Sequence, residues 1–179
     1  MMPVGPLMIE HRLIERLMPL IRGAVEAARR DGRIDPRFVA QVLDFVRTYA
    51  DRCHHGKEED ILFRELDRKP LSRAHRAVLN ELVEEHREGR KAVGELRLSL
   101  AAYERGDRAA LGTIIDRLDW LAAFYPGHIR KEDADFFLPC MDYFNAAERG
   151  ALLGEMREFD RKLIHDLYRD KLAEAGGGG

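Results

Sequence analysis

The chain has 179 residues, of which 45% are hydrophobic and 35% are charged, with a formal net charge of −2. This length suits one domain with its own core, and the near-neutral charge argues against a protein that binds nucleic acid or an acidic membrane surface. No apolar run approaches the roughly 20 residues that cross a bilayer, and the two cysteines, Cys53 and Cys140, predict no disulfide framework, so we expect a cytoplasmic location.

Helical periodicity runs through the chain, and alternating strand patterns are almost absent. The first predicted helix has an inward face on which the residues recur in steps of three and four: Leu7, His11, Ile14, Met18, Ile21, Val25 and Ala28. Pro19 is expected to bend this helix. The stretch "RRDGRIDP" ends it, with Asp35 as the cap and Pro36 at the first position of a second helix that runs to about residue 66.

Two further long helices and a C-terminal helix complete the pattern. The third follows the break "DRKPLS" and carries Leu79, Leu82, His86, Gly89, Val93, Leu96, Leu100 and Tyr103 on one face. The fourth begins near Asp107 and carries Leu111, Ile114, Leu118, Leu121, Tyr125, His128 and Glu132, with a kink expected at Pro126. Asn145 can cap a fifth helix over residues 146–173. Residues 1–175 are therefore predicted to form a single all-α domain, an up-down four-helix bundle with an additional C-terminal helix, followed by a Gly tail at 176–179.

Imidazoles and carboxylates fall on the inward faces of all four bundle helices. The sequence "HHGKE" places Glu59 four residues after His55, and "HIRKE" repeats that spacing with His128 and Glu132. Neighbouring helices of an up-down bundle run antiparallel, so the starts of odd helices and the ends of even helices share one end of the bundle. Six side chains are thus expected in one layer: His11, His55, Glu59, His86, His128 and Glu132.

A buried cluster of this composition needs a compensating charge, and a metal supplies it. Four imidazoles and two bridging carboxylates give about eight bonds, whereas two octahedral ions need about twelve. One bridging oxygen adds two more, which leaves about two open positions, as in sites that bind small molecules. Mixed nitrogen and oxygen ligands favour iron, with manganese as the alternative. Gly89, one turn after His86, leaves room for a bound diatomic molecule.

The order of these motifs resembles the bacterial hemerythrin-like proteins with the HHE cation-binding domain. The stretches "MIEHRLIERL" and "HHGKEEDILF" carry the resemblance, which covers about residues 8–140. It implies a four-helix bundle with a non-haem centre of two iron ions joined by an oxo or hydroxo bridge. The ligands carried over are the same six residues, with Glu59 and Glu132 bridging.

One departure concerns the third helix, where oxygen-carrying hemerythrins have two histidines four residues apart. Here Arg90 follows His86 at that spacing, and the last pair is HxxxE. Simple oxygen carriage is therefore not the expected function. Three classes remain. The first is a protein that binds or senses oxygen, peroxide or nitric oxide. The second is a di-iron enzyme with peroxidase-like or nitric-oxide-reducing activity, with iron handling as a further alternative, and the third is an interaction module with a vestigial site. The expected partner is a small molecule, and no protein partner is predicted.

Several neighbouring residues have ordinary structural interpretations. His54 and Glu58 should point about 100° away from His55 and Glu59 on an α-helix, towards the surface or the periphery of the site. Tyr125 is expected in the core, with its hydroxyl near the metal layer. Cys53 is expected to be an inert thiol and His165 a solvated side chain on the outer helix.

Overall fold

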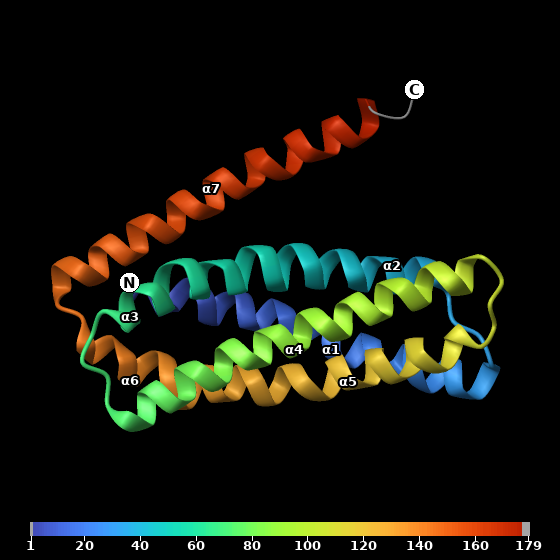
Figure 1. The fold of residues 1–179 in the computed structure, drawn as a ribbon, viewed down its shortest axis with the longest axis horizontal. Helices are drawn as coiled ribbons and strands as arrows, with labels where there is room; N and C mark the ends of the chain where they lie inside the picture. Colours follow the sequence, from blue (N-terminus) through green and yellow to red (C-terminus); the bar gives the residue numbers. More distant parts are fainter. Residues whose placement is uncertain (1, 177–179) are drawn as a thin grey trace.

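The computed structural model describes residues 2–176 as four antiparallel helical rods and one diverging helix (Figure 1). The first rod is α1 (Val4–Asp31), and the third is α4 (Arg73–Glu104). The second rod runs through α2 (Pro36–Phe45), η1 (Val46–His55), η2 (Glu58–Phe63) and α3 (Arg64–Asp67). The fourth runs through α5 (Ala110–Arg130), η3 (Lys131–Phe137), α6 (Leu138–Cys140) and η4 (Met141–Tyr143). The last helix is α7 (Ala146–Gly176).

The ends of the helices follow local capping chemistry. The Asp35 side chain accepts a hydrogen bond from the Arg37 backbone N–H and so caps α2, as the sequence predicts. Asn145 and Glu148 each bond the other's backbone N–H at 3.0 and 2.9 Å, a capping box that starts α7. At the end of α1, Gly32 takes φ +65°, a left-handed conformation that glycine adopts without a steric penalty.

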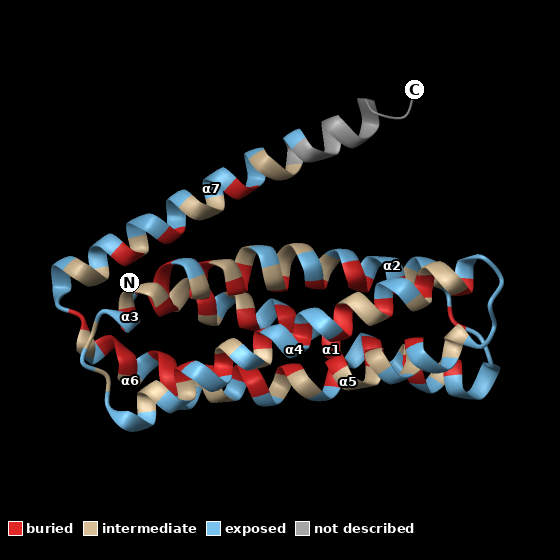
Figure 2. Ribbon diagram, viewed as in Figure 1, coloured by how far each residue is buried: buried red, intermediate tan, exposed pale blue. Residues whose placement is uncertain are grey.

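The buried apolar residues form two clusters, one toward each end of the bundle. Figure 2 shows the buried residues along the helices of the bundle. On α1, Leu7 belongs to one cluster and Ile14 to the other, with His11 between them. On α4, His86 likewise lies between Leu82 and Val93. A polar layer therefore crosses the core where the sequence places it, with apolar packing on both sides.

Two of the rods are not α-helical through this layer. Residues 46–55 and 58–63 of the second rod, and residues 131–137 of the fourth, are π-helical. A π-turn closes a hydrogen bond from i to i+5 and holds more residues per turn than an α-turn. The inward face of the second rod consequently drifts away from the 3.6-residue period, and neighbouring residues can share it.

The helix α7 packs against the second rod through residues that include Leu152, Met156 and Leu163. Leu152 and Met156 enter the apolar cluster at one end of the bundle, and Phe159 lies against Gly56. A Cβ at position 56 would lie 2.8 Å from the tip of the Phe159 ring, so any larger residue would require that ring to shift. The axis of α7 diverges from the bundle along its length (Figure 1).

This architecture confirms the predicted all-α bundle with an additional C-terminal helix, which continues to Gly176. Residues 177–179 of the predicted Gly tail lie outside the described residues. Within the described residues no helix is long and apolar enough to cross a membrane.

Candidate metal centre

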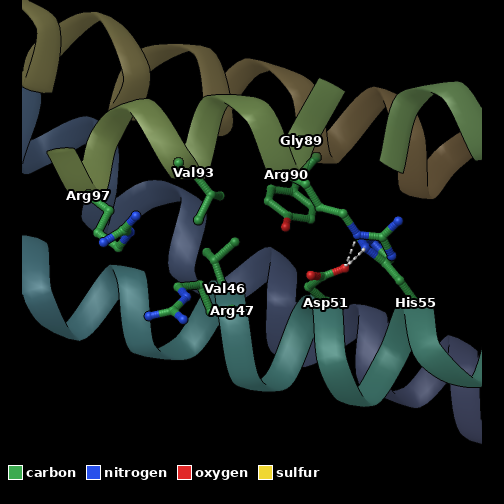
Figure 3. Close-up of a pocket in the computed structure, with 10 residues that line it drawn as sticks. Val46, Arg47, Asp51, His55, Gly89, Arg90, Val93 and Arg97 are labelled. Carbon is green, nitrogen blue, oxygen red and sulfur yellow. Dashed lines mark hydrogen bonds and ion pairs between the residues drawn. The ribbon is translucent and has the colours of Figure 1, made fainter. Parts of the chain in front are cut away.

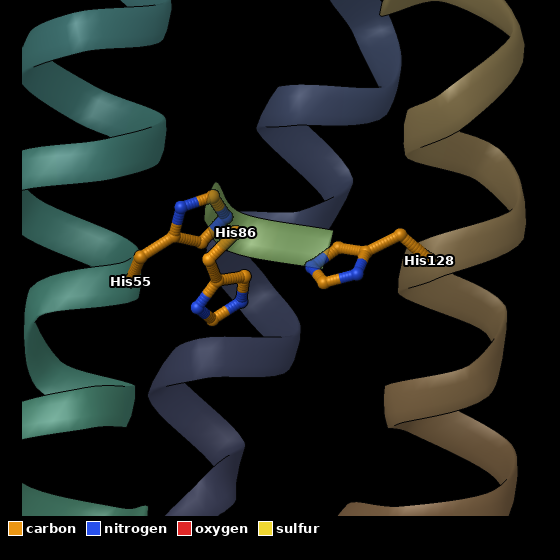
Figure 4. Close-up of side chains that lie close together, drawn as sticks. All are labelled: His55, His86 and His128. Atoms are coloured by element: carbon orange, nitrogen blue, oxygen red, sulfur yellow. The ribbon is translucent and has the colours of Figure 1, made fainter. Parts of the chain in front are cut away.

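Five histidines and two glutamates fill the polar layer. They are His11 from α1, His54, His55 and Glu58 from the second rod, His86 from α4, and His128 and Glu132 from the fourth rod. Every one of them is buried. They divide into two groups whose donor atoms lie within 4.8 Å of one another: His55, His86 and His128 in one, and His11, His54, Glu58 and Glu132 in the other. The rings of the first group converge from three rods (Figure 4).

The prediction that Glu59 enters this layer is corrected by the structure. Glu58 is the second rod's inward carboxylate, with none of its side chain exposed, whereas the Glu59 side chain is 28% exposed. Glu59 instead accepts a hydrogen bond from His86 Nδ1 at 2.6 Å and pairs with Arg90 at 2.8 Å. The inward stripe of this rod continues through Val46, Ala50, His54 and Glu58 in steps of four, a spacing that the wider π-turns help to keep on one face.

The expectation for His54 is corrected in the same way. Its side chain is 1% exposed and points into the layer beside His11, whose ring centroid lies 4.5 Å away. His55 remains inward too, stacked on His86 with 3.9 Å between centroids. Consecutive histidines both reach the core because they end the π-helical segment η1.

Each inward carboxylate faces both groups of histidines. Glu58 Oε1 lies 3.1 Å from His54 Nε2, and Glu58 Oε2 lies 3.4 Å from His86 Nε2. Glu132 Oε2 lies 3.2 Å from His11 Nε2, and Glu132 Oε1 lies 3.4 Å from His128 Nε2. This is the arrangement expected of carboxylates that bridge two metal ions.

An outer ring of carboxylates fixes the orientation of all five imidazoles. A carboxylate only accepts hydrogen bonds, so each Nδ1 carries the proton and each Nε2 faces inward. The five pairs are His11–Asp133 at 2.7 Å, His54–Glu10 at 2.9 Å, His55–Asp51 at 3.3 Å, His86–Glu59 at 2.6 Å and His128–Glu85 at 2.8 Å. Such carboxylate–histidine pairs are typical of imidazoles that bind metals.

The inward atoms have no hydrogen-bond partners. Across the described residues, the buried side-chain nitrogen and oxygen atoms left unpaired are the five inward Nε2 atoms, both oxygens of Glu58 and of Glu132, and Arg117 Nε. A buried polar group without a partner costs roughly 1–3 kcal/mol, and a charged one costs more. Nine unpaired nitrogen and oxygen atoms in one layer therefore indicate a ligand that binds them all. Imidazole nitrogens and carboxylate oxygens are atoms that coordinate metal ions.

The pKa values of the buried histidines are shifted in opposite directions. Burial alone would lower the pKa of His54, but the charge of Glu58 and the hydrogen bond to Glu10 raise it to about 10. Burial and the neighbouring ring of His86 lower the pKa of His55 well below its usual value. Because a metal binds the neutral ring, His55 is ready to coordinate, whereas His54 must first lose a proton.

A second ionic cluster connects this layer to α7. Lys57 is fully buried, and its ammonium group pairs with Glu10 and, at 2.6 Å, with Asp160 of α7. Glu10, Cys53 and Asp160 could themselves hold a cation, but the ammonium of Lys57 already lies against the two carboxylates. Burial raises the pKa of Cys53 to about 11, so its sulfur stays a thiol that contacts Asp160 at 3.6 Å.

Replacing Lys57 with methionine should destabilise the fold by about 3 kcal/mol, because Glu10 loses a buried partner. Urea unfolding of the two proteins measures this loss. The exposed Lys91 is the matched control, and Lys91→Met should change stability by less than about 0.5 kcal/mol. Equal stability of the Lys57 and Lys91 variants would show that the Lys57 cluster contributes nothing to the fold.

A cavity of about 140 Å³ adjoins the layer on the side of His55 (Figure 3). Gly89 lines it, and a Cβ there would meet only the Phe124 ring at 3.9 Å, so this glycine leaves open space as the sequence suggests. Tyr125 also lines it and is 2% exposed. Burial and the charge of Asp51 raise the pKa of Tyr125, which keeps its hydroxyl protonated.

Comparison with protein families agrees with this geometry. Residues 2–139 match the family model described as the hemerythrin HHE cation binding domain. The chain belongs to the hemerythrin family. No curated protein and no solved structure gives a significant match.

Within this hemerythrin domain, five of the six residues singled out from the sequence lie in the polar layer. The structure adds His54 and Glu58 and moves Glu59 to the outer ring. The sequence did contain a sign of these two residues, because histidines occupy both positions 54 and 55 and glutamates occupy both 58 and 59. Either member of each pair could face inward, and the local helix type decides which one does. The position four residues after His86, where oxygen-carrying hemerythrins have a histidine, holds Arg90, which pairs with Asp51 and Glu59 in the outer ring.

Proposed function

We propose that this protein holds two iron ions and binds or senses a small oxidant, namely oxygen, peroxide or nitric oxide. The ligands in this proposal are the seven residues of the polar layer: His11, His54, His55, Glu58, His86, His128 and Glu132. The observation that carries it is the set of nine inward nitrogen and oxygen atoms without hydrogen-bond partners. Membership of a cation-binding family supports the presence of a metal independently.

The number of metal–protein bonds determines how many coordination positions remain for an outside ligand. Five imidazoles supply one bond each and two bridging carboxylates supply two each, so the protein gives about nine of the roughly twelve bonds that two octahedral ions accept. One bridging oxygen supplies two more, which leaves about one position for an outside ligand. Nitrogen and oxygen donors favour iron, with manganese as the alternative.

The uneven division of the histidines indicates where that position lies. His55, His86 and His128 gather on one side, whereas only His11 and His54 accompany the carboxylates on the other. The ion on the side of His11 and His54 would therefore keep the open position. When bound, iron supplies redox chemistry and affinity for oxygen, peroxide or nitric oxide. The chain's own part is to orient the rings through the outer carboxylates and to exclude water with the two apolar clusters.

A second candidate is an enzyme that reduces peroxide or nitric oxide. Reduction consumes protons, and the Tyr125 hydroxyl lines the cavity that reaches His55. The free thiols Cys53 and Cys140 suit a reducing compartment, so we propose the cytoplasm as the site of either function.

Spectral titration of the iron-loaded protein separates the two candidates. We expect about two irons per chain and a spectral change that is complete at about one equivalent of nitric oxide or peroxide and reverses when the ligand is removed. Continuous consumption of the ligand would favour the enzyme instead. His165→Ala, on the exposed face of α7, is the matched control and should behave as the unaltered protein does. A purified chain that binds no iron and shows no spectral change would refute both candidates.

A further inference from the structure

The cavity beside the metal layer carries an excess of positive charge. It lies between the second rod and α4, and Val46, Val93 and Gly89 form part of its apolar wall (Figure 3). Three guanidinium groups line it, from Arg47, Arg90 and Arg97, against a single carboxylate, that of Asp51.

The charge of Asp51 is already compensated. Its Oδ1 pairs with Arg90 Nε at 2.8 Å and accepts a hydrogen bond from His55 Nδ1 at 3.3 Å. Neither Arg47 nor Arg97 has a carboxylate partner among the described residues, and both side chains are exposed at the cavity mouth. Two cations without a carboxylate partner therefore border a partly open pocket with largely apolar walls, where an anion is attracted more strongly than on a flat surface.

Tyr125, which also lines this space, carries a further hydrogen-bond donor. Tyr125 is 2% exposed, and its hydroxyl has no hydrogen-bond partner among the described residues. The hydroxyl oxygen is not among the buried side-chain atoms left unpaired, so it stays accessible to a molecule in the cavity. Because Tyr125 lines the cavity together with His55, a ligand in the cavity can supply that partner.

We infer that this cavity binds a small monovalent oxyanion of the formate or nitrite type. One oxygen accepts the hydrogen bond of Tyr125, and the negative charge faces Arg47 and Arg97. A volume of about 140 Å³ holds an anion of three or four heavy atoms and a few waters, since a water occupies about 30 Å³. The small volume favours such an anion over a larger carboxylate such as citrate. The site uses no residue of the metal layer except at its boundary with His55, so it goes beyond the proposed function.

Titration of carbon-13 formate, observed by NMR at low ionic strength, tests the inference on the metal-loaded protein. Formate is chosen because it is redox-inert toward iron. We expect saturable binding that weakens at least about tenfold in the double variant Arg47→Gln/Arg97→Gln and severalfold in Tyr125→Phe. Gly94→Leu should abolish binding, since Gly94 lines the cavity and has open space at its Cβ position.

Arg37→Gln is the matched control, because Arg37 is exposed and outside the cavity, and its affinity for formate should stay within about twofold of the original. Circular dichroism and iron content establish that each variant is folded and loaded. Formate affinity that is unchanged in both the arginine double variant and Gly94→Leu would overturn the inference, as would the absence of saturable binding or equal affinity for citrate. The formate result does not decide the proposed function, because that function depends on iron binding. If the iron content of these variants is unchanged, the proposed function stands even if formate does not bind.

Discussion

Replacing Glu58 with glutamine should remove most of the bound iron, whereas the same replacement of Glu59 should weaken iron binding much less. The Glu58 oxygens lie 3.1 Å from His54 Nε2 and 3.4 Å from His86 Nε2, one toward each group of histidines. Loss of this charge removes a donor that both metal ions share. Glu59 only holds His86 Nδ1 from outside, and the loss of such an outer partner typically costs about ten- to hundredfold in metal affinity.

Iron content after desalting, together with competition against a chelator, measures both effects. We expect Glu58→Gln to weaken affinity by at least about a further tenfold relative to Glu59→Gln. The two variants are matched, since they are adjacent and remove the same charge. Iron retained in Glu58→Gln but lost in Glu59→Gln would reverse the assignment and restore the α-helical register in this segment.

Removal of the metal should lower the melting temperature of the protein substantially. A ligand that binds only the folded state at about a thousandfold above its dissociation constant contributes about 4 kcal/mol. For a chain of this size that corresponds to a fall of roughly 8–16 °C. The physical reason is that the carboxylates of Glu58 and Glu132 stay buried without a metal to neutralise them.

The size of this metal effect should increase with pH. Without metal, protonated histidine rings neutralise part of the charge of the buried carboxylates. Burial disfavours a charged ring, but the carboxylates around the rings raise the pKa of His54 to about 10 and that of His86 to about 9. A raised pKa in the folded state stabilises the protein fully below the unfolded value, about 6.5, and the stabilisation is lost as the pH rises through the folded value. The metal-free protein should therefore lose stability between about pH 7 and 10.

Melting curves of the loaded and stripped protein at pH 7 and pH 9 test this directly. We expect the difference in melting temperature to be larger at pH 9, because the metal replaces protons that are then absent. Indistinguishable curves for loaded and stripped protein at both pH values would support the third class considered from the sequence, an interaction module whose site no longer functions.

Periodicity alone located the helices and the height of the polar layer. His11, His86, His128 and Glu132 all lie on stripes with steps of three and four, and each is buried where those stripes meet. The first and third rods are α-helical across the layer, so the 3.6-residue rule applies to them without correction.

The second rod could not be assigned in this way. Adjacent residues of an α-helix point about 100° apart. On an α-helix, either His54 and Glu58 or His55 and Glu59 would therefore face the core, but not both pairs. In the π-helical segment both histidines face inward and only Glu58 accompanies them. Wider turns of this kind are held by the tertiary packing around the site, and the sequence carries no local rule that marks them.

The outer carboxylates were equally hidden, because they come from distant parts of the chain. Asp133 follows Glu132 in sequence yet orients His11, 122 positions away, and Glu85 precedes His86 yet orients His128. The position of each acid on its own helix predicts only an ordinary charged residue at the surface. Only the antiparallel arrangement of the rods brings each acid to the ring that it holds.

Anomalous diffraction at the iron absorption edge, from crystals of the iron-loaded protein, tests the central claim most directly. Two peaks are expected in the polar layer, one bounded by the Nε2 atoms of His55, His86 and His128 and the other by those of His11 and His54, with Glu58 and Glu132 touching both. A single peak, or peaks away from these nine donor atoms, would contradict the account.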